Sequence, residues 1–415
     1  MQPIPSEPTQ LVAHLFRHEA GRMVSVLTCM LGFDKLELAE DIVQDTMIMA
    51  LRSWPFNGIP DNPSSWLYKV AKNRALDIVR RQATLQKIST ELAYDTEPTV
   101  MNEPLFHEDA FTDSQLRMLF ACCHPSVSFD AQVTLCLKIL GGLSVREIAN
   151  AFLTTEETIT KRLYRAKEKL RSELTVLAVP TGGQLTHRLD AVLQSIYLLF
   201  NEGYTSSHPD LLIRRDLSTE AMRLCLLLTD YPLTAQPQTY AMLALFCFQA
   251  ARFDSRLDET GAIVLLPDQD RSQWNQEFIK RGRHYLSLSA QGDVLGAYHF
   301  EAGIALLHSL SPSFEQTNWN AILSYYNELY RLKPSPVVAL NRAVAQSQIG
   351  QVAEALDCVR QLDTLTHNQY YHAILADLYQ KNQQPELAKY HYNLAIERTT
   401  SRAEQALLAR KRDSL

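Results

Sequence analysis

The residues most suited to chemistry lie in one segment of the sequence, residues 143–174. Between Lys161 and Arg171 there are six basic residues and one acidic residue, a net charge of +5. Cations and hydroxyls that share one helix face can contact the phosphates and base edges of duplex DNA. The alternative is a solvated charged helix on a bundle. The polar face expected here comprises Thr158, Lys161, Arg162, Arg165 and Lys169.

A second group follows a proline-containing loop, in "IPDNPSSWLYKVAKNR" (residues 59–74). Pro60 and Pro63 stiffen the loop, and Asn62, Ser64 or Ser65 can cap the helix that follows. Cations beside aromatic and amide side chains suit a single-stranded nucleic acid whose bases have left the stack. Taken alone, Trp66 is more often a core anchor. The candidate contacts are Asn62, Ser65, Trp66, Lys69, Lys72, Asn73 and Arg80.

A third group contains carboxylates that could bind a hard cation or act as acid and base. It comprises Asp254, Asp258, Glu259, Asp268 and Asp270. No nucleophile, metal-binding histidine pair or glycine-rich phosphate loop accompanies them. The adjacent Cys122-Cys123-His124 lacks the second ligand pair of a zinc site. We therefore expect a protein that is not an enzyme and that needs no metal or other cofactor.

Composition narrows the class of protein. The 415 residues, 46% hydrophobic and 21% charged, are typical of a soluble globular protein with two or three domains. The net charge of −6 equals that of residues 82–115 alone, so it does not argue against basic surfaces elsewhere. Seven irregularly spaced cysteines, no secretory signal and no membrane-spanning apolar run predict a cytoplasmic protein with reduced thiols.

Almost every periodic segment predicts a helix, so the expected fold class is all-α. We expect three or four helices over about residues 10–81, interrupted by a loop at 55–65. An acidic connector over roughly 82–112, a helical block over 113–175 and a joint at 180–183 follow. Helices continue to residue 415, except at 252–274, where the turn residues predict a hairpin or an ordered loop.

Within residues 143–171 the pattern predicts a helix-turn-helix. Ser144 can cap a first helix, and Thr154 or Thr155 a second one that begins with acidic residues. Such a pair, with a basic outer face on the second helix, can enter a major groove. The buried stripe of the second helix should be Ile159, Leu163, Ala166 and Leu170.

The end of the chain shows internal repetition. Two segments, within residues 335–359 and 370–395, each predict a pair of short antiparallel helices, with Ala355 and Ala388 in equivalent places about 33 residues apart. This spacing is near the 34-residue period of tetratricopeptide (TPR) repeats. Generic helical hairpins are the alternative.

Several motifs together resemble one family. "LAEDIVQDTMIMALRSWP" (38–55), "PDNPSSWLYKVAKNRALDIVRR" (60–81), the acidic connector and the helix-turn-helix resemble, in order and spacing, bacterial sigma factors of the extracytoplasmic-function (ECF) type. The segments "RFDSRLDETGAIVLLPDQDRSQW" (252–274) and "LKPSPVVALNRAVA" (332–345) resemble the carboxy-terminal extension of the group that bears a TPR-like domain.

The resemblance implies domains and partners. Residues 1–93 would form sigma domain 2, 94–112 a linker and 113–176 sigma domain 4. Residues 185–415 would form a helical regulatory domain, with TPR-like repeats in about 320–400. The partners implied are promoter DNA and core RNA polymerase, through its β′ clamp helices and β flap, and a possible protein regulator at the carboxy-terminal domain. No membrane contact is expected.

The resemblance also implies a role for each element. The acidic helix around Asp41, Gln44 and Asp45 would dock on the β′ clamp helices. The loop at 57–65 would capture a flipped base of the minus-ten element, and residues 66–81 would support strand opening. Residues 155–170 would read the minus-35 element. At the corner of the helix-turn-helix, Leu153 stands where many of these factors have glycine.

The preferred interpretation is a sigma factor that directs core RNA polymerase to specific promoters and is regulated by its carboxy-terminal domain. The alternative is a polymerase-independent helix-turn-helix regulator with a TPR-like sensor domain. That alternative leaves the loop before Trp66 without a role.

Overall fold

The computed structural model describes residues 8–89, 108–152, 154–174, 177–180, 183–206, 212–292 and 294–415. The predicted all-α class is confirmed. Over these ranges the chain forms eighteen α-helices and short 3-10 helices, and its one isolated β-bridge joins Leu257 and Ile263. None of the described helices is long and apolar enough to span a membrane. Leu153 and most of the predicted linker lie outside the described residues.

The chain divides into two compact units, and each is described by itself. Unit 1 comprises Met1–Leu199 and Thr219–Leu227, and unit 2 comprises Phe200–Ser218 and Leu228–Leu415. Helices α8 and α9 contribute to both units. The amino-terminal half of the chain forms η1 (Phe33–Lys35) and the helices α1 (Pro8–Leu31), α2 (Leu36–Asn57), α3 (Pro63–Ser89), α4 (Glu108–Cys122), α5 (Phe129–Ile139), α6 (Val145–Ala151), α7 (Glu156–Glu173), α8 (Gly183–Tyr204) and α9 (Arg215–Asp230).

Helix α2 is longer than the sequence predicted. We expected a loop from residue 55, but the helix continues through Pro55 to Asn57. Pro55 lies in the last turn, so its missing N–H removes a single helical hydrogen bond, the one to the carbonyl of Leu51, and only two helical residues follow it. The helix ends at Gly58, whose φ of +81° favours glycine and whose N–H donates to Trp54 O at 3.1 Å.

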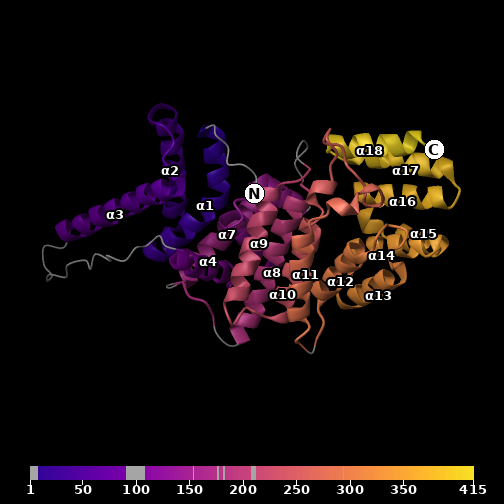
Figure 1. Ribbon diagram of the computed structural model, residues 1–415. Coiled ribbons are helices and arrows are strands. Elements are labelled where there is room, and N and C mark those ends of the chain that lie inside the picture. The colour runs from indigo at the N-terminus through magenta and orange to yellow at the C-terminus, as the bar shows by residue number, and fades with distance from the viewer. Residues whose placement is uncertain are drawn as a thin grey trace. The chain divides into compact units, whose positions relative to one another are not determined.

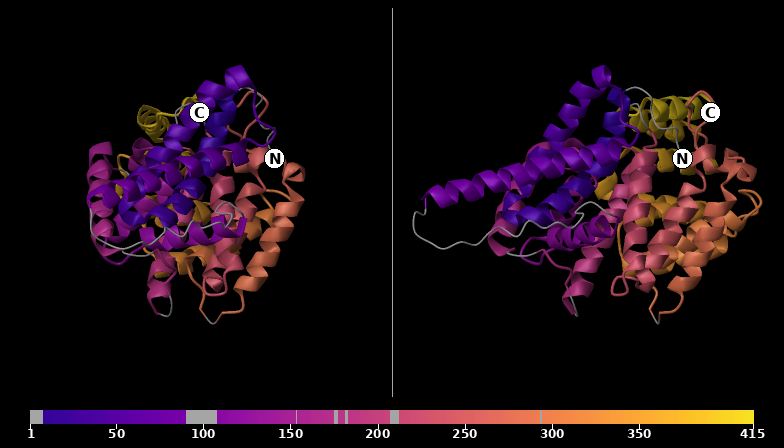
Figure 2. Two further views of the ribbon diagram at one scale, coloured as in Figure 1. Left: turned by 90° about the vertical axis from the view of Figure 1, so that its left-hand side faces the viewer. Right: turned by 60° about the vertical axis from the view of Figure 1, so that its left-hand side comes forward.

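The first turns of helix α3 pack into the core of unit 1. Leu67, Ala71 and Ala75 are fully buried in unit 1. Figures 1 and 2 show that the remainder of the helix extends away from α1 and α2. These three residues, spaced four positions apart, form one buried face over the first three turns of the helix.

The helix-turn-helix forms as its local sequence dictates. Ser144 and Glu147 make a reciprocal capping box at the start of α6, and Thr155 caps α7 by accepting a hydrogen bond from Thr158 N–H at 3.3 Å. The predicted stripe of Ile159, Leu163, Ala166 and Leu170 is buried, each at 8% exposure or less. Both helix starts and the inward face of α7 are confirmed.

Helix α1 packs very closely against the end of α5. A Cβ atom at Gly21 would lie 2.7 Å from Leu140 O, so that position has no room even for a methyl group. The thiol of Cys29, on the same helix, lies 4.0 Å from Ser114 O of α4. Within unit 1 the elements that resemble the two sigma domains are therefore in direct contact.

The beginning of the extension also belongs to unit 1. Ser195, Ile196 and Leu199 of α8 line a small apolar cavity together with Leu119 of α4 and Cys136 of α5. Arg188 donates to Phe120 O at 3.4 Å. The core of the helix-turn-helix domain therefore includes residues that the predicted boundaries assigned to the carboxy-terminal domain.

Unit 2 is a stack of paired helices, seen at the right of Figure 1. Its 3-10 helices are η2 (Phe253–Ser255), η3 (Leu266–Asp268), η4 (Arg271–Gln273) and η5 (Asp363–Leu365). Its further α-helices are α10 (Pro237–Ala250), α11 (Gln276–Ser289), α12 (Ala297–Leu310), α13 (Trp319–Leu332), α14 (Pro336–Gln348), α15 (Val352–Arg360), α16 (Gln369–Lys381), α17 (Pro385–Arg398) and α18 (Arg402–Asp413).

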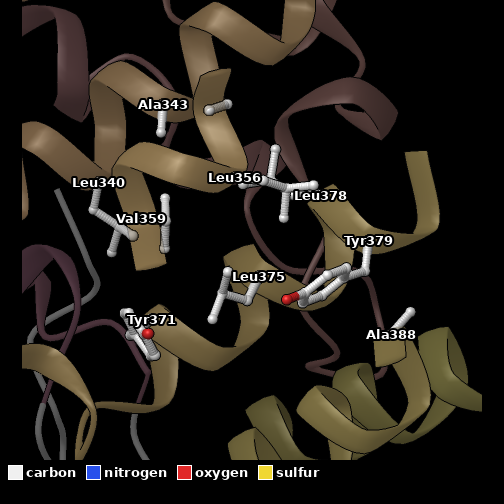
Figure 3. Close-up of a cluster of buried hydrophobic side chains, with 10 residues drawn as sticks. Leu340, Ala343, Leu356, Val359, Tyr371, Leu375, Leu378, Tyr379 and Ala388 are labelled. Atoms are coloured by element: carbon white, nitrogen blue, oxygen red, sulfur yellow. The ribbon is translucent and has the colours of Figure 1, made fainter. Parts of the chain in front are cut away.

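The repeated segments form the expected helical pairs, α14 with α15 and α16 with α17. Ala355 and Ala388 are both fully buried. Their small side chains allow neighbouring helices to approach closely. Leu356, Leu375 and Tyr379 fill the space between the pairs, as Figure 3 shows.

Residues 252–274 form an ordered loop with one antiparallel bridge and three 3-10 turns, rather than an extended hairpin. Arg256 holds this loop, because its guanidinium donates to Tyr204 O at the end of α8 and lies 3.8 Å above the Tyr204 ring. A cation at the carboxyl end of a helix interacts favourably with the helix dipole.

Candidate nucleic-acid interface

The amino-terminal half of α7 exposes part of the predicted polar face. Thr158, Lys161 and Arg165 are all exposed, and Lys161 pairs with Glu157 at 2.6 Å one helical turn away. Arg165 makes no ion pair with any residue that the structure describes. Tyr164 is 67% exposed beside it, and the sequence reasoning passed over this residue. Its place in the sequence, close to the predicted contacts Lys161 and Arg165, could have identified it as a further candidate.

Arg162 faces a different way from its neighbours. Its side chain is only 21% exposed and lies 3.7 Å from the Asp130 carboxylate. It also lies 3.4 Å from Thr134 Oγ1 and 5.0 Å above the Phe152 ring. Arg162 therefore connects α7 to α5 and to the end of α6, and its predicted contact with DNA stays a prediction.

In the carboxyl-terminal half of α7 the basic side chains form ion pairs within the protein. Lys167 pairs with Glu40 of α2 at 2.7 Å, and Arg171 lies 3.3 Å from Glu37. Lys169 pairs with Glu173 at 2.9 Å, and the salt bridge lowers the pKa of the Glu173 carboxyl. The charge available to a nucleic acid is thus smaller than the net +5 counted from the sequence.

The loop before α3 is held at several points. Asn62 is the residue that caps the helix, since its Oδ1 accepts from Ser65 N–H at 2.9 Å. Ser64 donates to Glu19 of α1 at 3.1 Å, and the Tyr68 hydroxyl donates to the same carboxylate. Glu19 was not singled out from the sequence, because it lies far from the loop along the chain.

Trp66 is half-buried and meets Trp54 of α2 edge to face, with ring centroids 5.6 Å apart. Trp54 itself is only 2% exposed. Such aromatic pairs contribute about 0.5–1.5 kcal/mol beyond area burial. Trp66 thus supports the loop as a core anchor would, while part of its ring stays accessible, as a contact with a single-stranded nucleic acid would require.

Beyond the first turn, α3 presents cations. Lys69 and Asn73 are exposed, Lys72 is half-buried, and neither lysine pairs with a described carboxylate. Arg80 is exposed and lies 3.8 Å from Asp77. The structure therefore brings the residues predicted for the second group onto one continuous loop and helix.

The outer face of α2 combines polar and apolar side chains. Asp41 and Gln44 are exposed, and Asp45 is half-exposed and pairs with Arg74 of α3 at 3.0 Å. Ile48 and Met49 continue the same face, at 43% and 42% exposure. Helical spacing after Gln44 and Asp45 could have revealed these two. A face of this mixed character is typical of protein interfaces.

The carboxylates of the third group serve the loop itself. Asp258 Oδ1 accepts from the N–H groups of Thr260 and Ala262, both at 2.9 Å, and Asp270 Oδ1 accepts from Ser272 N–H at 2.9 Å. Hydrogen bonds from the Thr260 and Ser272 hydroxyls, together with these backbone ones, lower the pKa of the Asp258 and Asp270 carboxyls. Asp254 pairs with Arg215 at 2.6 Å. Among the residues described, no three histidine, cysteine or acidic side chains are placed to hold a metal ion.

Comparison with known proteins follows the same division of the chain. Residues 15–84, which contain α2, the loop and most of α3, match the family Sigma-70 region 2. The ECF sigma factor SigE of Mycolicibacterium smegmatis is 31% identical over 138 residues, 33% of this chain and 51% of that protein. SigX of Bacillus subtilis is 26% identical over 140 residues, 33% of this chain and 71% of its own length. The chain belongs to the ECF sigma factors.

The extension has its own relatives. Residues 188–290 of this sigma factor match a family of unknown function, DUF6596. An uncharacterized protein of Rhizobium meliloti is 36% identical over 387 residues, 92% of this chain and 91% of that protein. Among solved structures, yeast Tom70 aligns with 98% of this chain and 87% of its own, at 10% identity and a TM-score of 0.35. Beyond the region that matches the sigma factors, the chain carries a large helical extension.

Proposed function

We propose that this sigma factor opens promoter DNA at the minus-ten element through the loop before α3 and the first turns of that helix. The observation that carries the proposal is the held loop with exposed Ser65, Lys69 and Asn73 on one continuous surface. Lysines can follow the backbone of a displaced strand, and amides and aromatic rings can hold a base outside the stack. We further propose that this occurs in the cytoplasm.

The minus-35 element would be read by the amino-terminal half of α7. Thr158, Lys161 and Arg165 are exposed there, with Tyr164 beside them. In helix-turn-helix proteins the amino-terminal residues of the second helix contact base edges, and arginine recognises guanine with two hydrogen bonds. Arg162, which faces α5, supports this surface from behind.

Docking on polymerase would use the outer face of α2. Asp41, Gln44 and Asp45 supply acidic and amide groups, while Ile48 and Met49 supply apolar contact. The sequence resemblance assigns this helix to the β′ clamp helices and also implies a contact with the β flap. A peptide of either polymerase element should compete with core polymerase for binding, and the surface that it protects would identify the docking site of that element.

The test is reconstituted transcription. Purified protein with core polymerase should produce promoter-specific transcripts, whereas neither component alone should do so. A mobility shift with and without core enzyme separates this function from the polymerase-independent regulator, which would bind duplex DNA tightly by itself. No stimulation across a genomic promoter library would contradict the proposal.

The carboxy-terminal region is proposed to regulate the sigma factor through its paired helices, which provide a surface for a protein regulator. The unit boundaries sharpen the experiment. Ending the chain after Leu227 keeps every residue of unit 1, whereas ending it before residue 185 removes Leu189, Ile196 and Leu199 from that core. Higher or lower transcription from the longer truncation would identify inhibition or activation. Unchanged transcription would dismiss both roles.

A further inference from the structure

The Glu19 carboxylate of α1 uses both of its oxygens on the loop and first turn of α3. Oε1 accepts from Ser64 Oγ at 3.1 Å, and Oε2 accepts from the Tyr68 hydroxyl. Glu19 is buried, with its side chain 12% exposed, and Arg22 lies 3.5 Å away as its charge partner. A buried carboxylate with these partners is costly to remove, because both donors would lose their acceptor.

The contacts fix the orientation of the proposed opening surface. Ser64 and Tyr68 are four residues apart, so both face α1 from one side of α3. Ser65 comes directly after Ser64 and Lys69 directly after Tyr68, and both are exposed. The same turn is held a second time by Trp66 against Trp54. The side that faces α1 is therefore immobilised, and the adjacent side is presented outward.

We propose that Glu19 is a positioning residue for promoter opening. It touches no DNA in this assignment; it keeps Ser65, Trp66 and Lys69 in one arrangement before the strands separate. This inference rests on the proposed function of the loop. Ordering a free loop only when it binds DNA would consume part of the binding free energy, and a preorganised loop avoids that loss.

The experiment uses the full-length chain in complex with core polymerase. The readout is permanganate reactivity of unpaired thymines at the minus-ten element, measured beside polymerase affinity and the melting temperature. Replacing Glu19→Ala should lower the opened fraction on the order of tenfold, with polymerase affinity unchanged. Ser64→Ala and Tyr68→Phe should each give a smaller loss, and Glu19→Gln an intermediate one, because its amide oxygen can still accept one hydrogen bond.

Controls separate positioning from general stability. Glu277→Gln removes an exposed carboxylate that pairs with Arg281 in unit 2, and it should leave opening unchanged. If Glu19→Ala does not fold, the double variant Ser64→Ala with Tyr68→Phe carries the test, since it keeps Glu19 and Arg22. On the double background, Glu19→Gln should add little further loss, because both hydrogen bonds are already gone.

The outcomes distinguish the two proposals. Failure of the wild-type protein to open any promoter would overturn the proposed function itself. An active wild type with undiminished opening in Glu19→Ala, or in the double variant, would overturn the positioning role alone. A loss of opening that merely follows the melting temperature, or equals the loss of polymerase affinity, would also overturn it.

Discussion

Helices α3 and α7 are the two proposed DNA-contacting helices, and the lysines on the first turns of α3 differ from the basic residues of α7 in how they are paired. On α7, five of the cations have a carboxylate within 4 Å: Lys161, Arg162, Lys167, Lys169 and Arg171. On the first turns of α3, Lys69 and Lys72 pair with none of the described carboxylates. There the rigid contacts are made by neutral or buried groups, namely Asn62, Trp66 and Glu19.

The difference separates charge from availability. Most basic side chains of α7 form ion pairs within the helix or with neighbouring helices. Arg165 is the basic residue of α7 that has no carboxylate partner among the described residues. On α3 the fold is secured by other side chains, so that the lysines remain open. The number of cations on a helix therefore overstates the charge that it can offer to a nucleic acid, unless pairing within the protein is counted as well.

The strongest test of the comparison reverses charge on α3. Lys69→Glu with Lys72→Glu should reduce promoter opening roughly 100-fold at low salt, because two attractions to phosphate become repulsions. Permanganate footprinting at several salt concentrations measures the loss. Lys280→Glu with Lys333→Glu, at two exposed positions of unit 2, reverses the same number of charges and is the matched control. Equal losses in both variants would mean that only net charge matters.

The second test compares two arginines on α7. Arg165→Ala should weaken binding to the minus-35 element about tenfold without changing stability, as expected for a lost base contact. Arg162→Ala should chiefly lower stability, because it releases Asp130 and the Phe152 ring. Fluorescence anisotropy and urea unfolding measure the two effects. The reverse result would show that Arg162 is the open cation.

The third test concerns the ion pair between α7 and α2. Lys167→Glu should lower the unfolding free energy by about 0.5–1 kcal/mol, a small effect because the pair is partly exposed. The double variant Glu40→Lys with Lys167→Glu should restore most of the lost unfolding free energy. The two charged groups lie 2.7 Å apart, so exchanging the residues again places opposite charges in contact. Urea unfolding measures each variant. If the swap restores nothing, the pair does not form in solution.

The smallest effect is expected at the exposed pair of Asp45 and Arg74. Asp45→Asn should change the unfolding free energy by less than about 0.5 kcal/mol. Polymerase affinity should fall several-fold in the same variant if Asp45 contributes to docking. Calorimetric titration with core enzyme measures the affinity. A stability loss above 1 kcal/mol would assign Asp45 to the fold and not to the interface.

Local patterns predicted local structure well. The caps at Ser144 and Thr155, and the buried stripe from Ile159 to Leu170, depend on residues within one or two turns, which periodicity reveals. The repeat spacing likewise predicted the helical pairs of unit 2. Pro55 misled the boundary of α2, because proline is tolerated near a helix end.

Contacts between distant residues escaped prediction. Nothing near Ser64 indicates that Glu19 accepts its hydrogen bond, and nothing on α7 indicates that Lys167 meets Glu40. One sequence reports which side chains are polar and which face they share. Which of them pair across helices depends on tertiary packing. Arg162 belonged to the predicted polar face for this reason, although its side chain turns toward α5.

The shared core of α4, α5 and α8 also limits how such a protein can be engineered. A chimera that joins this extension to another sigma factor directly after α7 would leave Ile196 and Leu199 of α8 facing whatever the new sigma domains supply. An exposed apolar surface of that kind promotes aggregation. Exchange would succeed only if α8 travelled with the helices it covers, so the interchangeable module is not the one that the sequence motifs delimit.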